Sequence, residues 1–132
     1  MSEPIKHQKQ IIVQPADIDQ LNHVNNTVYL KWVQDISEEH WYKQTTPDIQ
    51  AQYVWMVLEH HIKYKKQAML GDEITAVTYV HEMTGVRSIR HVEFYKDDQL
   101  LVECHSHWCM LDAELLRPKR VPEDLKELFR EG

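Results

Sequence analysis

The chain has 132 residues, of which 42% are hydrophobic and 27% are charged, and its formal net charge is -6. This length fits a single domain, expected to span residues 1–132, and the apolar content argues against a disordered or fibrous chain. The negative balance argues against nucleic acid as a partner, because non-specific binding to phosphates needs a basic surface.

The first predicted elements are a strand and a long helix. Residues 5–14 end in a β-branched run that favours a strand closing before Pro15. The Asp- and Asn-rich segment that follows is typical of a loop leading to a helix N-cap, at Asn25 or Asn26. Apolar residues then recur at helical spacing from 27 to about 43, which predicts the only long amphipathic helix.

After a turn-like stretch at 45–51, the chain is predicted to form four strands and a short helix. Alternating and β-branched patterns predict the strands, at residues 54–65, 73–83, 88–96 and 100–111. Short turns between them favour an antiparallel meander, in which the strand 54–65 pairs with the strand 73–83. Residues 122–130, with a proline in the first turn, predict the short helix.

These elements predict an α+β hotdog fold, in which a five-stranded antiparallel sheet wraps around one long central helix and a short C-terminal helix follows. The helix has one apolar stripe and the sheet has one face to bury. Each covers the apolar surface of the other when the sheet curls around the helix.

Two features concern the compartment in which the protein works. No apolar stretch resembles a signal peptide or is long enough to cross a bilayer, so we expect a cytoplasmic protein with no membrane partner. Cys104 and Cys109 lie on one predicted strand and point to opposite faces, so we expect two free thiols, as in a reducing compartment.

The loop before the long helix, together with the start of that helix, resembles the signature of the 4-hydroxybenzoyl-CoA thioesterase-like hotdog family. The segment reads Asp17-Ile-Asp19-Gln-Leu-Asn22-His23-Val-Asn25-Asn26-Thr-Val-Tyr29-Leu-Lys-Trp32. Residues 61–72, with their Gly-Asp turn, and residues 108–121 are similar to the second strand and the last strand of that family. The resemblance therefore covers most of the chain.

The resemblance implies an enzyme that hydrolyses acyl thioesters without a metal or an organic cofactor. Its substrate would be an acyl-CoA or an acyl-carrier-protein (acyl-ACP) thioester, and its sites would form between subunits of a homodimer or a homotetramer. By carry-over onto matching positions, Asp19 would be the catalytic carboxylate. The backbone N–H near Asn26 would polarise the thioester carbonyl.

The chemistry of these residues is consistent with that role. A helix N-terminus has unpaired N–H groups with partial positive charge, which can stabilise the oxyanion of the transition state. Asp19 precedes it, as a general base that activates water or as a nucleophile, and the sequence leaves both routes open. His23 and Asn25 would orient Asp19 or the water, or stabilise the loop, and Asn25 and Asn26 also suit helix caps.

Three further residues are expected to bind the substrate: Tyr29, Arg87 and Ser88. Tyr29 is the aromatic residue of the motif, and Arg87, just before Ser88, matches a position that is often basic in the family. A basic group there would meet the phosphates of coenzyme A. A second basic cluster consists of Arg117, Lys119 and Arg120.

The chain departs from the pattern of the related plant acyl-ACP thioesterases. Those enzymes have an Asn two residues after the Asp, a His four residues after it, and an acidic or thiol residue on the second strand. Here His23 matches, but Leu21 stands at the Asn position, and Gln67 and Ala68 at the strand positions. The departure favours the simpler scheme of Asp19 and a helix N-terminus.

Other hypotheses remain open. A non-catalytic acyl-CoA-binding module would need no carboxylate beside the thioester, and Asp19 could be only a turn residue. A dehydratase would need a His with an acidic partner on the helix, for which His40 with Glu38 or Glu39 is a poor match. His105 and His107 point to one face, but the sequence supplies no obvious third ligand, so we expect no metal site.

Overall fold

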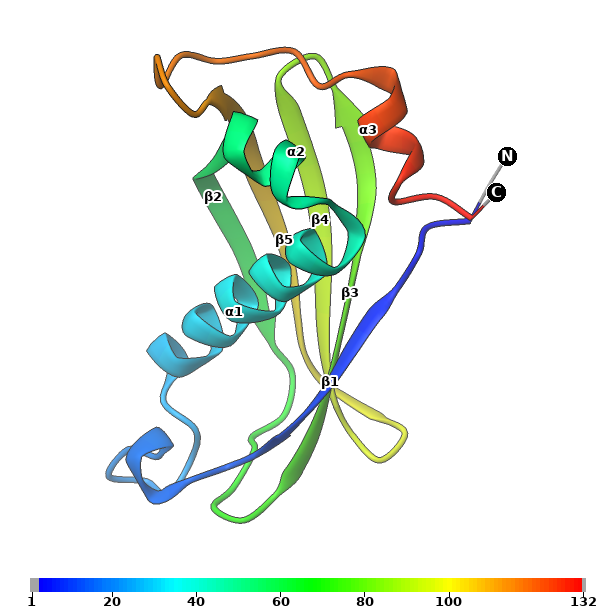
Figure 1. Ribbon diagram of the computed structural model, residues 1–132. Helices are drawn as coiled ribbons and strands as arrows, with labels where there is room; N and C mark the ends of the chain where they lie inside the picture. The colour runs from blue at the N-terminus through cyan, green and yellow to red at the C-terminus, as the bar shows by residue number, and fades with distance from the viewer. Residues whose placement is uncertain (1–2, 132) are drawn as a thin grey trace.

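The computed structural model describes residues 3–131, in which one antiparallel sheet carries one long helix (Figure 1). The order across the sheet is β1-β3-β4-β5-β2, and every neighbouring pair is antiparallel. The strands are β1 (His7–Ile12), β2 (Tyr53–Tyr64), β3 (Glu73–Thr84), β4 (Arg87–Lys96) and β5 (Gln99–Asp112). The helices are α1 (Asn26–Gln44), α2 (Pro47–Gln52) and α3 (Glu123–Glu127), with a 3-10 turn, η1, at Pro15–Asp17.

The predicted long helix is confirmed as α1, which crosses one face of the sheet (Figure 1). Its N-cap is Asn25, whose side chain accepts a hydrogen bond from the backbone N–H of Thr27 over 3.0 Å. It ends at Thr45, whose N–H bonds to the carbonyl of Trp41 over 3.1 Å. The residues that α1 buries follow the predicted spacing: Tyr29, Trp32, Val33, Ile36, Ser37, His40 and Trp41.

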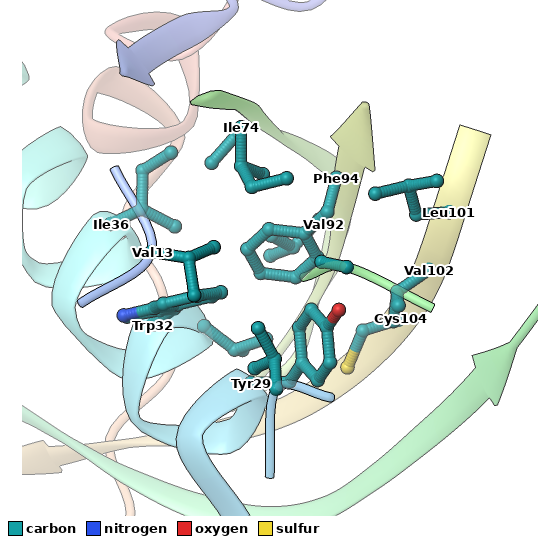
Figure 2. Close-up of a cluster of buried hydrophobic side chains, with 14 residues drawn as sticks. Val13, Tyr29, Trp32, Ile36, Ile74, Val92, Phe94, Leu101, Val102 and Cys104 are labelled. Atoms are coloured by element: carbon teal, nitrogen blue, oxygen red, sulfur yellow. The ribbon is translucent and has the colours of Figure 1, made fainter. Parts of the chain in front are cut away.

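The main core lies between the first half of α1 and the sheet (Figure 2). Tyr29 packs edge-on against Phe94 of β4, with ring centroids 5.4 Å apart, and Trp32 packs edge-on against Tyr29 at 5.3 Å. Burial of each such side chain contributes about 1.5–3 kcal/mol relative to exposure. This packing holds the N-terminus of α1 in a fixed position against the sheet.

A second core lies at the other end of α1, where α3 packs (Figure 1). Trp41 of α1 stacks on Phe129, with centroids 6.1 Å apart, and meets Trp55 of β2 edge-on at 5.7 Å. Leu125 of α3 is also buried there. The predicted C-terminal helix is confirmed, over Glu123–Glu127, and it closes this end of the layer between α1 and the sheet.

The predicted meander of four strands is wrong in its first pairing, between β2 and β3. β2 pairs with β5, and β3 pairs with β1 and β4, so only β3, β4 and β5 form a meander. The link between β2 and β3 is a packed loop, in which Ala68 is buried, rather than a hairpin turn. β1 takes the place beside β3, and β2 becomes an edge strand.

The stretch at 45–51, predicted to be turn-like, contains the helix α2 instead. The side chain of Thr46 caps it by accepting from the N–H of Ile49 over 3.4 Å, and Pro47 stands in the first turn. Proline suits this position because its missing N–H would be unpaired there in any case. α2 leads the chain directly into β2.

The cysteines and the helices bear on where the protein works. Both cysteines are free, as predicted, and both are buried. Burial raises the pKa of the Cys104 thiol, so this thiol is not an activated nucleophile. Over residues 3–131, none of the helices has the length and apolar character that crossing a membrane requires.

Candidate active site

Asp19 lies in a tight loop that precedes α1. The loop is closed by an antiparallel bridge between Ile18 and Val24 and by a hydrogen bond from Asp19 N–H to the carbonyl of His23, at 2.8 Å. Asn22 adopts a φ of 63°, a left-handed conformation that Asn tolerates better than most residues. The loop therefore has a defined shape.

The side chain of Asp19 is exposed, and its two oxygens differ in their contacts. Oδ1 accepts hydrogen bonds from the backbone N–H groups of Leu21, at 2.8 Å, and His23, at 3.2 Å. Oδ2 has no hydrogen-bond partner among residues 3–131. Oδ1 therefore stabilises the turn, which is the role expected if Asp19 were only a turn residue. Oδ2 is open to water or a ligand.

The loop is anchored to the link between β2 and β3. The N–H of Val24 donates to the carbonyl of Ala68 over 3.0 Å, and His23 forms a bridge with Met69. Asn25 N–H donates to the carbonyl of Asp17 over 2.8 Å. These bonds hold the exposed carboxylate and the start of α1 in one rigid unit.

The N-terminus of α1 has one backbone donor without a described partner. The Asn25 side chain accepts from Thr27 N–H, and the Asn25 carbonyl accepts from Val28 N–H over 2.9 Å. No hydrogen bond is described for the N–H of Asn26, the first helical residue. The predicted cap is confirmed as Asn25, and the Asn26 N–H lies at the positive end of the helix, where a partial charge of about +0.5 is expected.

Two of the predicted site residues near this loop lie in different surroundings. His23 is half-buried and holds the loop through its backbone. Tyr29 is buried in the core, with 2% exposure, and burial raises its pKa to about 12. Tyr29 therefore packs against the sheet and is not part of an open surface.

The other two predicted substrate-binding residues are on β4, near the C-terminal half of α1. Arg87 is exposed at the start of β4, and Ser88 is buried beside it. Ser88 lines a cavity of about 420 Å³ between the second half of α1 and the sheet. This volume is in the range of small-molecule sites. Its lining consists of Gln34, Ser37, Glu38, Trp41, Tyr42, Gln50, Tyr53, Val54, Trp55, Val57, Met83, Ser88, Arg90 and Trp108.

Arg90 is the residue of this cavity that sequence analysis missed. It lies on the inner face of β4 with 6% exposure. Its Nη1 donates to Nδ1 of His40 over 2.8 Å and to Oγ1 of Thr78 over 3.1 Å. The available signal was an arginine at an inward position of the β4 alternation, between Ser88 and Val92.

His40 is bonded to this arginine and not to an acidic residue. Burial, and secondarily the charge of Arg90, lower the pKa of His40 to about 3, so its ring is neutral near pH 7. The His–acid pair that a dehydratase would need, between His40 and Glu38 or Glu39, is not formed in the structure.

The histidines of β5 lie on the outer face of the sheet, away from the Asp19 loop. His105 stacks on His91, with centroids 4.2 Å apart. His107 has neighbours that the sequence pattern did not show: ligand atoms of Glu59, His61 and His107 all lie within 4.8 Å of one another. The carboxylate of Glu59 lies 3.5 Å from the ring of His61 and 3.7 Å from the ring of His107.

The fold matches that of solved structures, among them proteins described as thioesterases. The probable thioesterase YbaW of Escherichia coli superposes with a TM-score of 0.81 at 20% identity, covering 92% of this chain and 94% of that chain. A 1,4-dihydroxy-2-naphthoyl-CoA thioesterase of Synechocystis gives 0.79 at 15% identity, covering 94% and 95%. The Staphylococcus aureus protein SAV2348, solved in complex with CoA, gives 0.79 at 19% identity, covering 97% and 82%.

At these identities the structural matches establish the hotdog fold alone. No curated protein matches the chain by sequence. A family model does: the model of the thioesterase-like superfamily matches residues 13–129, which include the Asp19 loop, α1 and all strands after β1. The chain belongs to the thioesterase-like superfamily.

Proposed function

We propose that the protein hydrolyses acyl-CoA thioesters to a free carboxylic acid and a thiol, with Asp19 as the catalytic carboxylate. Acyl-ACP is the alternative carrier. The observation that carries the proposal is the Asp19 loop, which presents an unpaired carboxylate oxygen and leads into a helix whose first N–H, on Asn26, is also unpaired. No metal or organic cofactor is required.

These two groups supply what thioester hydrolysis needs. The Asn26 N–H and the positive end of α1 stabilise the negative charge that develops on the carbonyl oxygen, and one such donor contributes about 3 kcal/mol to the transition state. Asp19 either takes a proton from the attacking water or attacks the carbonyl carbon itself, forming an anhydride that water then opens. In both routes the C–S bond breaks and coenzyme A leaves as a thiolate.

We propose that each site is shared between two copies of the chain. β2 is twelve residues long, and its second edge is unpaired among residues 3–131. It also exposes apolar side chains, with Val54 39%, Met56 46% and Leu58 42% exposed. A long edge strand of this kind readily pairs with another strand, and pairing with the β2 of a second copy gives a twofold homodimer.

The direction of β2 supports a shared site. Four of its first five residues line the cavity: Tyr53, Val54, Trp55 and Val57. Tyr64, at its end, reaches the start of α1, where its hydroxyl lies 3.4 Å from the carbonyl of Asn26. Antiparallel pairing of two β2 strands sets the start of one beside the end of the other. The cavity of one copy then faces the Asp19 loop of its partner and can receive the acyl group.

A homotetramer, formed by two such homodimers, is the alternative assembly.

A cytoplasmic location is also a proposal. The two buried free thiols are consistent with it, because the cytoplasm keeps cysteines reduced.

Thiol release tests the proposed function directly. The full chain is incubated with acyl-CoAs of graded aliphatic length and with aroyl-CoAs, and free thiol is measured with a thiol-reactive dye. The proposal expects multiple turnovers on at least one series. Tight binding of acyl-CoA without thiol release would instead support the non-catalytic binding module, and loss of water from a 3-hydroxyacyl-CoA would support a dehydratase.

A further inference from the structure

Arg90 is a buried cation without a described anion. It is 6% exposed, and no carboxylate among residues 3–131 lies within 4.0 Å of its nitrogens. Burial alone lowers its pKa to about 9, so it remains charged at neutral pH. Proteins rarely keep a buried charge without a partner, because its lost hydration is not compensated.

The hydrogen bonds of Arg90 leave one edge of its guanidinium open. Both described bonds, to His40 and Thr78, use Nη1. Nε and Nη2 have no described partner, and they are not among the polar atoms sealed from solvent. Arg90 lines the cavity, and we infer that this open edge is the part of its guanidinium that a ligand there would meet. Nε and Nη2 together form the fork that binds both oxygens of a carboxylate.

The rest of the cavity is suited to an acyl group that ends in a charged oxygen. Its walls include Trp41, Trp55 and Trp108, which supply apolar surface. Ser88 lies two residues before Arg90 on the same face of β4. Glu38 is the only acidic residue in the lining, and it is exposed and unpaired with Arg90. The positive charge at the inner wall of the cavity is thus left for a ligand.

We propose that Arg90 binds a carboxylate on the acyl group, at the end remote from the thioester, and so makes the protein selective for carboxylated acyl-CoAs. This inference rests on the proposed function and on the cavity as the acyl site. The carboxylate can belong to an aliphatic dicarboxylic acid or to an aromatic one. In both cases its two oxygens face Nε and Nη2 of Arg90.

Matched substrate pairs test the proposal. Adipoyl-CoA and hexanoyl-CoA have acyl groups of equal length and differ in the terminal carboxylate, and 4-carboxybenzoyl-CoA and 4-methylbenzoyl-CoA form the aromatic pair. We expect kcat/KM to favour the carboxylated member of at least one pair by about tenfold or more, as for a charged hydrogen-bonded contact. The pair that responds identifies the aliphatic or aromatic source. Equal kcat/KM within both pairs would overturn the proposal.

Two variants assign the selectivity to Arg90. Arg90→Met keeps the volume and removes the charge, and it should abolish the preference, whereas Arg90→Lys keeps the charge but loses the fork and should retain part of it. A preference that persists in Arg90→Met would also overturn the proposal. The comparison in the wild-type chain decides the matter even if a variant does not fold.

Binding separates this proposal from the proposed function. Affinity for the same pairs is measured in Asp19→Asn by the change in tryptophan fluorescence, because three tryptophans line the cavity. Selective binding of carboxylated acyl-CoAs without thiol release from the wild-type chain would support Arg90 and overturn the hydrolase. Hydrolysis of hexanoyl-CoA, with equal rates and affinities for the carboxylated and uncarboxylated members of each pair, would support the hydrolase and overturn the role of Arg90.

Discussion

The guanidinium of Arg90 donates a hydrogen bond from Nη1 to Nδ1 of His40 over 2.8 Å. Arginine has only donors, so Nδ1 of His40 must accept, and the ring is neutral with its proton on Nε2. Nε2 is itself buried without a partner among the described residues. The two side chains therefore support each other only while His40 is uncharged.

The neutral state of His40 makes the stability depend on pH. The pKa of His40 falls from its ordinary 6.5 to about 3 on folding, so between these values the unfolded chain binds a proton that the folded chain does not. The free energy of unfolding should therefore fall as the pH falls below 6.5, by at most about 1.4 kcal/mol per pH unit from this residue. Urea denaturation between pH 7 and pH 4 measures the slope.

The control for this prediction is His40→Gln, which keeps an acceptor for Arg90 but cannot titrate. Its stability should depend less steeply on pH than that of the wild-type chain. A slope remains, because burial and nearby histidines also lower the pKa of His91, to about 4. Identical slopes for the wild-type chain and His40→Gln would contradict the buried neutral ring.

The cap of α1 is predicted to stabilise both the helix and the site. Asn25→Ala removes the oxygen that accepts from Thr27 N–H and should lower the free energy of unfolding by about 1 kcal/mol. Asn25→Asp keeps an accepting oxygen and should lose less stability. Urea denaturation at pH 7 checks the order of the three proteins, and equal stabilities would contradict the role of the cap.

The edge of β2 is predicted to hold two copies together. Met56→Asp places a charge on the exposed apolar strand of each copy, so that sedimentation should show monomers and thiol release should be lost. The matched control is Ile12→Asp, which charges a 57% exposed residue on β1, at the opposite edge of the sheet. If both changes disrupt the dimer equally, or if neither does, the sedimentation result would contradict pairing through the β2 edge.

Mixing two inactive variants tests whether the site is shared. Asp19→Asn removes the charge of the proposed catalytic carboxylate, and Val57→Trp fills the cavity of its own chain. In a mixed dimer with shared sites, the intact Asp19 of one copy faces the intact cavity of the other. Equal amounts, unfolded and refolded together, should regain about a quarter of the wild-type rate, because half of the random dimers are mixed and each has one good site. No recovery would indicate that each site lies within one chain.

Local patterns predicted most of the elements, but not their pairing. The spacing of Tyr29, Val33 and Ile36 identified α1, and Asn25 was one of two expected caps, because these signals depend on neighbouring residues. The pairing of β2 with β5 joins segments that are far apart in the sequence, and the alternation within each strand does not encode which strand it pairs with.

Sequence patterns pointed to the Asp19 loop but not to the cavity, because only the loop is made of neighbouring residues. The Asp19 loop is contiguous in sequence and was recognised as a motif. The cavity combines residues of α1, α2 and four strands, so no spacing in the sequence marks it. Tyr29 was expected at the site because it belongs to the motif, but the helical spacing that identified α1 also places this side chain in the core.

The most direct test of the central claim is the rate of thiol release by Asp19→Asn. Asparagine can still accept the hydrogen bonds from Leu21 and His23, so the loop keeps its shape while the charge is lost. We expect kcat/KM to fall by about a hundredfold or more, with unchanged melting temperature, while Asp98→Asn, an exposed turn residue, keeps the wild-type rate. Folded Asp19→Asn with wild-type kcat/KM would contradict the assignment of Asp19 as the catalytic carboxylate.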